Sequence, residues 1–98
     1  MMSIHIVQMS RLVVSEVIRG CSIQSRVAVI EKWVAVADIC RCLHNFNGVL
    51  QVCAAFQNSS VFRLKKTWEK VSKNVRRQIS DELFIDLHWK FFLVYDYE

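Results

Sequence analysis

The stretch that decides the fold begins with Arg26-Val-Ala-Val-Ile-Glu-Lys-Trp33, continues through Cys40-Arg-Cys-Leu-His-Asn-Phe-Asn-Gly48, and ends with Asn58-Ser-Ser-Val-Phe-Arg-Leu-Lys-Lys-Thr-Trp68. The first and last pieces carry apolar residues every three or four positions, which is the period of a buried helix face. Between them, His44-Asn-Phe-Asn47 interrupts the pattern with polar side chains. The segment therefore predicts a packed helical layer that displays one group of amide and imidazole side chains.

The composition around this stretch favours one small helical domain. The chain has 98 residues, of which 53% are hydrophobic; it has no proline, and glycine occurs only at Gly20 and Gly48. Because so few residues break helices or form tight hairpins, we predict an all-α fold rather than a mixed α+β fold. A chain this small and apolar is not expected to bury all of its hydrophobic side chains, which suggests a partner surface.

Helical patterns lie on both sides of residue 20. Residues 10–18 carry an apolar stripe that stops at Gly20, whereas residues 1–9 fit a strand and a helix equally well. Ser22 is a suitable N-cap for a second helix. Two apolar stripes cover most of the circumference of this second helix, so we expect it to be central and largely buried. Residues 49–56 predict a short apolar helix after it.

The polar corner at residues 44–48 joins these two helices. Asn45 is expected to end the first of them in a left-handed conformation, and Asn47 to cap the second. Phe46 is expected to fill the corner between them. Capping alone explains both asparagines; the alternative is that the exposed amides hydrogen-bond the backbone of a partner, and the spacing does not separate these two interpretations.

A basic region follows the corner. Apolar residues recur at helical spacing through residues 61–71, which predicts one amphipathic helix with its basic side chains outside. Trp68 shares the apolar face, so an interior position is favoured over stacking on a nucleic-acid base, and no nucleic-acid partner is expected. We treat residues 1–73 as one partial domain and residues 74–98 as a divergent segment whose apolar residues also fit helical spacing.

No motif predicts covalent catalysis, a metal site or a cofactor. Cys40, Cys42 and His44 are two positions apart, so on a helix successive members point to opposite sides and do not converge on a metal ion. Neither an acid/base pair nor a phosphate-binding glycine loop occurs. The four cysteines lie mostly among apolar residues, so free, buried thiols in a reducing compartment are expected. Neither a secretory signal nor a membrane span is expected.

The residues from Arg26 to Leu50 and from Asn58 to Lys70 resemble the catalytic domain of Ras guanine-nucleotide exchange factors (RasGEF), and most of all its Ras-releasing-factor (RasGRF) branch. The resemblance extends from about Met9 to about Lys73. It implies an all-helical fold and a Ras-family small GTPase as partner. Such factors promote GDP release by stabilising the nucleotide-free GTPase, without covalent chemistry. A cytoplasmic protein, recruited to the inner membrane surface through partners, is also implied.

By the same resemblance, the end of the second helix and the Asn-Phe-Asn corner face the GTPase. The residues implied to contact it are polar and lie at this corner: Arg41, His44, Asn45 and Asn47. The residues implied to support this surface from within come from the following region: Arg63, Leu64 and Trp68.

The chain also departs from the family pattern. The family domain is longer, and it includes a proline-containing segment and a helical hairpin that displaces the first switch region of the GTPase; these residues have no counterpart in the sequence. We therefore expect a fragment with little or no exchange activity alone. The alternative hypothesis is a non-catalytic helical module that binds another protein through exposed apolar surface.

Overall fold

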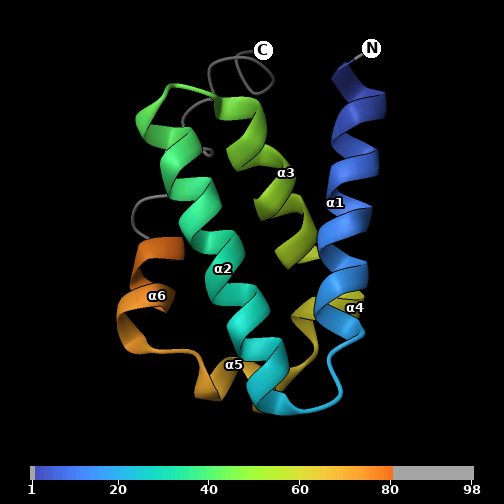
Figure 1. Ribbon diagram of the computed structural model, residues 1–98, viewed down its shortest axis with the longest axis vertical. Helices are drawn as coiled ribbons and strands as arrows, with labels where there is room; N and C mark the ends of the chain where they lie inside the picture. The colour runs from blue at the N-terminus through green and yellow to red at the C-terminus, as the bar shows by residue number, and fades with distance from the viewer. Residues whose placement is uncertain (1, 81–98) are drawn as a thin grey trace, which may run out of the picture.

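The protein folds as a layer of three long helices with three short ones at one end and side (Figure 1). The computed structural model describes residues 2–80. Within these residues the elements are α1 (Met2–Ile18), α2 (Ile23–Cys42), α3 (Phe46–Gln57), α4 (Ser59–Phe62), α5 (Lys65–Lys70) and α6 (Lys73–Arg77). No strand occurs in this range. The all-α prediction is confirmed.

α3 supplies the centre of the core, because it lies between α1 and α2 and contacts both (Figure 1). Half of its twelve residues are buried: Val49, Gln51, Val52, Cys53, Ala55 and Phe56. The long helices on either side add short aliphatic side chains: Val13 and Val17 from α1, and Ile30, Val34 and Ala37 from α2. Burial of these groups away from water is the main stabilising contribution to the layer.

α2 is less buried than its sequence predicts. Ile30, Val34 and Ala37 are buried, and Trp33 and Cys40 pack partly against the core. Val36, Ile39 and Leu43 are exposed, with Leu43 at 73% of its full accessibility. The expectation of a helix buried around most of its circumference is therefore wrong. The physical reason is that α1, α3 and α5, the described neighbours of α2, leave the side that carries Val36, Ile39 and Leu43 uncovered.

The connection between α1 and α2 follows the predicted pattern. α1 extends back to Met2, so the structure shows the helical alternative for residues 2–9. Ser22 caps α2 as predicted, and its hydroxyl accepts a hydrogen bond from the Ser25 amide at 3.1 Å. Gly20 is needed for close approach, because a Cβ atom there would lie 2.7 Å from Cγ of Arg26.

The predicted helix over residues 61–71 is interrupted. α4 ends at Phe62, α5 begins only at Lys65, and Val71 has extended backbone (ψ 138°). The break after α5 has a local cause, since Ser72 caps α6 by accepting a hydrogen bond from the Val75 amide, while its own amide donates to Glu31. The apolar side of the prediction holds, because Val61 and Val71 are both buried.

The last described residues continue beyond α6. A wider helical turn over residues 78–80 follows α6, and the helical spacing predicted for the segment after it falls on residues 81–98, which lie outside the described residues. In the part of the chain that the structure describes, no helix combines the length and the hydropathy needed to cross a membrane.

Candidate functional site

The candidate site is the corner between α2 and α3, residues 43–47, which we call the elbow. His44 adopts the left-handed conformation (φ 60°), and the main chain closes around it. The His44 amide donates to the Arg41 carbonyl at 3.0 Å, and the Asn45 amide donates to the Cys40 carbonyl at 2.7 Å. These two bonds form a Schellman motif, which satisfies the last carbonyl groups of α2.

The roles of the two asparagines differ from the prediction. Asn45 does not end α2; its side-chain oxygen caps α3 by accepting a hydrogen bond from the Gly48 amide at 3.3 Å. Asn47 lies inside the first turn of α3 and is not the cap. The left-handed position falls on His44 because Asn45 is one residue further along, where a side-chain oxygen can reach the free amides of α3.

Gly48 holds the elbow against α2. A Cβ atom at this position would lie 2.5 Å from Sγ and 3.1 Å from Cβ of Cys40. The Asn45 side-chain nitrogen also approaches the Cys40 sulfur, at 4.0 Å. The start of α3 therefore packs on the last turns of α2 at a distance that only glycine allows.

The elbow borders a small cleft of about 160 Å³ between α1, α2 and α3. The lining combines apolar side chains from the three helices with the polar start of α3: Met9, Val13, Trp33, Val36, Cys40, Asn45, Asn47, Gly48, Gln51 and Val52. The side-chain oxygen of Asn47 is buried and has no hydrogen-bond partner among the described residues. An unpaired buried carbonyl oxygen costs about 1–3 kcal/mol, so a hydrogen-bond donor at this position would stabilise the site.

The other two predicted contact residues lie beside this cleft. Arg41 pairs with Asp38 of the same helix, with Nη2 and Nε of Arg41 at 2.9 and 3.2 Å from Oδ1 of Asp38. His44 is exposed, and its ring meets the Phe46 ring edge-on at 6.0 Å. The structure thus brings Arg41, His44, Asn45 and Asn47 together at one end of α2 and α3.

The predicted supporting residues are not next to the elbow. Trp68 packs edge-on against Phe56 at 5.6 Å and donates its indole N–H to the Val61 carbonyl at 2.9 Å. Leu64 packs against the same core, but Arg63 is exposed at the end of α4, not in the interior as expected. All three residues follow α3 in the chain, whereas the elbow precedes it. These residues can therefore stabilise the elbow only indirectly, through the packing of α3.

One arrangement near the cleft was not foreseen from the sequence. Glu16 of α1 accepts a 2.6 Å hydrogen bond from the indole N–H of Trp33, and both of its carboxylate oxygens lie 2.8 Å from Nζ of Lys32. The hydrogen bonds from Lys32 and Trp33 lower the pKa of Glu16 below its ordinary value. We call this group the Glu16 bridge; it joins α1 to α2 beside the cleft that Trp33 lines.

Arg26 ties three segments together at the other end of α2. Its Nε donates to the hydroxyl of the buried Thr67 in α5 at 3.1 Å, and its Nη1 donates to the Gly20 carbonyl at 3.0 Å. A charged donor that satisfies both a buried hydroxyl and a loop carbonyl fixes α5 relative to the α1–α2 connection. Sequence periodicity gave no signal for this contact, because residues 26 and 67 are distant in the chain.

The cysteines are only partly as predicted. All four thiols are free, but Cys53 alone is buried; Cys40 is half-buried, and Cys21 and Cys42 are exposed. Burial raises the pKa of Cys53 to about 12, so its thiol is unreactive at neutral pH. The described residues contain no group of three or more histidine, cysteine or acidic side chains placed to hold a metal ion.

The fold and the site together define an all-helical domain with a polar corner, at which Asn45 is exposed and the side-chain oxygen of Asn47 has no hydrogen-bond donor among residues 2–80. A family model described as the RasGEF domain matches residues 1–88. The chain therefore belongs to the RasGEF domain family, and the resemblance seen in the sequence is confirmed.

Individual relatives agree with this assignment. The chain is 57% identical over 72 residues to Ras-specific guanine nucleotide-releasing factor 2 of Mus musculus, an alignment covering 74% of the chain and 6% of the relative. It is 56% identical over 75 residues to Ras-specific guanine nucleotide-releasing factor 1 of Homo sapiens, covering 76% and 6%. Ras guanine nucleotide exchange factor E of Dictyostelium discoideum is 43% identical over 77 residues, covering 78% and 7%. The chain thus spans only about one-sixteenth of the length of these curated relatives. The domain boundary at residue 73 stays a prediction.

Proposed function

We propose that the chain is part of a guanine-nucleotide exchange factor for Ras-family small GTPases, and that its elbow contacts the GTPase. The observation that carries this proposal is the elbow geometry: His44 and Asn45 are exposed, and the buried Asn47 oxygen has no donor within the described range. Membership of the RasGEF family supplies the class of partner.

The mechanism requires only differential binding. A factor that binds the nucleotide-free GTPase better than the nucleotide-bound form shifts the population toward the empty state, and each 1.4 kcal/mol of preference is about a tenfold shift. Amide side chains suit this task, because each offers both donors and an acceptor to a backbone that has changed shape. We assign this role to Asn45 and Asn47, with Arg41 and His44 as neighbouring polar contacts.

We expect the 98 residues by themselves to accelerate nucleotide release weakly or not at all. One elbow and one small cleft offer few contacts that could distinguish the open from the closed GTPase. We therefore expect binding of the chain to the GTPase to be detectable even where acceleration of nucleotide release is not. A location in the cytoplasm, at the inner membrane surface through partners, belongs to the same proposal and is consistent with the four free thiols.

The test compares binding to a Ras-family GTPase in its nucleotide-free and GDP-bound forms by biolayer interferometry. We expect the chain to prefer the nucleotide-free form, and the Asn45→Ala/Asn47→Ala variant to lose about tenfold in affinity, as for one or two lost hydrogen bonds. Gln24→Ala is the matched control, because Gln24 is an exposed amide at the far end of α2. Equal loss in both variants, or equal binding to both GTPase forms, would overturn the proposal.

A second function is favoured by a different observation. Val36, Ile39 and Leu43 follow helical spacing and form an exposed apolar stripe along α2. Such a stripe suits a non-catalytic module that binds another helix. Binding of a partner that persists in the Asn45→Ala/Asn47→Ala variant but is lost in Ile39→Asp would favour this module over an exchange-factor surface.

A further inference from the structure

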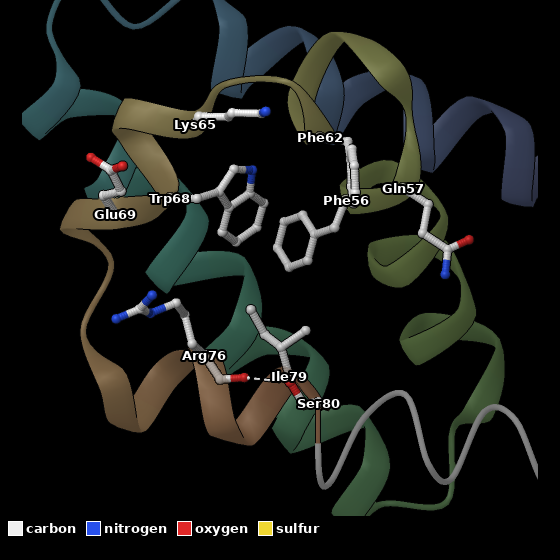
Figure 2. Close-up of a pocket in the computed structure, with 9 residues that line it drawn as sticks. All are labelled: Phe56, Gln57, Phe62, Lys65, Trp68, Glu69, Arg76, Ile79 and Ser80. Atoms are coloured by element: carbon white, nitrogen blue, oxygen red, sulfur yellow. Dashed lines mark hydrogen bonds between the residues drawn. The ribbon is translucent and has the colours of Figure 1, made fainter.

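A second, larger hollow lies away from the elbow, where α3 ends and α4, α5 and α6 meet (Figure 2). Its volume is about 640 Å³. The Phe56 and Trp68 rings stand next to each other at its centre, 5.6 Å apart, and Ile79 points toward them (Figure 2). Phe62 of α4 lies at its edge and is 69% exposed. We call this hollow the aromatic groove.

The groove is large enough, and apolar enough, to hold several side chains of a bound segment. Hollows of roughly 300–1,000 Å³ lined by aromatic residues are typical of binding sites in proteins. An exposed phenylalanine beside a half-buried tryptophan also leaves apolar area in contact with water, which association would remove. The first requirement for an occupant is therefore a set of apolar or aromatic anchors.

The charge around the groove gives the second requirement. Lys65 and Arg76 lie on its rim together with Glu69. Glu69 is the single carboxylate between positions 65 and 77, whereas six exposed basic side chains lie in that range: Lys65, Lys66, Lys70, Lys73, Arg76 and Arg77. Of these basic residues, Lys65 and Arg76 lie on the rim itself, so the rim carries two basic side chains and one carboxylate. This balance beside an apolar floor favours an acidic segment that carries hydrophobic anchors.

The chain itself contains a segment of this chemistry. Residues 81–98 hold five of the nine carboxylate side chains of the protein and only one of its thirteen basic residues, Lys90. Their apolar residues include a set at helical spacing: Phe84, Leu87, Phe91 and Val94. The segment begins directly after Ser80, which already lines the groove. Covalent attachment at the edge of a site gives a segment an effective concentration on the order of millimolar.

We propose that the aromatic groove binds residues 81–98 of the same chain. The apolar side of the segment packs on Phe56, Phe62 and Trp68, and its carboxylates face the basic rim. This inference stands on the groove and on the charge distribution of the chain, and it does not rest on the proposed exchange function.

The test uses the full chain labelled with 5-fluorotryptophan and follows Trp68 by ¹⁹F NMR, with a soluble paramagnetic agent to report exposure. We expect Phe84→Asp/Leu87→Asp to shift the Trp68 resonance and to raise its broadening several-fold. Phe62→Asp, which places a charge at the groove edge, should do the same. Leu12→Asp is the matched control, because Leu12 is an exposed leucine of α1 outside the groove, and it should leave Trp68 unchanged. The Trp33 resonance monitors folding, since Trp33 lies beside the elbow cleft.

Each result decides the proposal. Protection of Trp68 in the parent chain that is lost in both Asp variants, with Trp33 unaffected, supports it. Equal broadening of Trp68 in the parent chain and in Phe84→Asp/Leu87→Asp overturns it. Protection that disappears on dilution, together with a dimer in sedimentation velocity, also overturns it, because the segment would then come from a second copy.

Discussion

At the scale of single residues, the elbow depends on contacts that are closer than sequence patterns reveal. Gly48, Cys40 and Asn45 meet within van der Waals distance, and the left-handed His44 turns the chain between them. The sequence predicts a polar corner here, but the left-handed turn falls on His44 and not on Asn45, and the cap of α3 is Asn45 and not Asn47. Composition and period locate a corner, whereas the main-chain bonds decide which residue takes each conformation.

Replacing Gly48 by alanine tests the close approach of α3 to α2. The new methyl group would lie 2.5 Å from the Cys40 sulfur, so either the Cys40 side chain or one of the two helices must shift. We expect the free energy of unfolding in urea to fall by about 1–3 kcal/mol, as in other overpacked cores. The double variant Gly48→Ala/Cys40→Ala should recover part of this loss, because it removes the sulfur. A Gly48→Ala chain with the parent stability would contradict the packing described for the elbow.

Glu16 provides a prediction for pH. Its pKa is lowered in the folded protein by hydrogen bonds from Lys32 and Trp33, so its contribution to stability is present above its ordinary pKa of 4.5 and is lost as pH falls through the lower folded value. The stability difference between the parent chain and Glu16→Gln should therefore shrink when urea unfolding is repeated at progressively lower pH below 4.5. In a Trp33→Phe background this pH dependence should weaken. A constant difference across that range would mean that the Glu16 bridge does not stabilise the fold.

At the scale of elements, the helices that are long and capped were predictable, and the interrupted ones were not. Ser22 acts as the N-cap that its residue type suggested, and Asn58 caps α4 in the same way. The region after Asn58 keeps its apolar face but divides into three pieces. The second of the two breaks arises because Ser72 starts a new helix instead of continuing α5. The spacing of apolar residues predicts which side of a helix faces the core, but it does not predict at which serine a new helix begins.

The division between α5 and α6 can be tested at Ser72. Ser72→Ala removes the hydroxyl that accepts the Val75 amide, and N-cap replacements of this kind cost about 1 kcal/mol. We expect a matching loss in the free energy of thermal unfolding. Ser59→Ala is the control, because α4 is capped by Asn58 and not by Ser59. Similar stability of Ser72→Ala and Ser59→Ala would show that the cap contributes little.

At the scale of the whole molecule, family membership was predictable and the exposed surfaces were predictable only in kind. The sequence indicated that so apolar a chain would leave hydrophobic area uncovered, but not that this area would lie along α2 and around Phe62. Long-range contacts such as Arg26 with Thr67 and Glu16 with Trp33 were also beyond the sequence, since they depend on how the helices pack. The local sequence predicts which face of a helix is apolar, but it does not predict which other helix that face packs against.

The exposed stripe of α2 should affect the solution behaviour of the chain. Ile39 and Leu43 lie one turn apart and are both more than half exposed. We expect concentration-dependent self-association in sedimentation velocity, reduced in Ile39→Ser/Leu43→Ser. Gln24→Ser, on the same helix, should leave it unchanged. Monomeric behaviour of the parent chain at all concentrations would show that the stripe alone does not drive association.

The Schellman motif at the end of α2 has a consequence for recognition. Because main-chain hydrogen bonds close the turn around His44, the conformation of the turn does not depend on a bound partner. A molecule that docks there meets a surface that is already rigid, so little configurational freedom is lost on complex formation and more of the contact energy appears as affinity.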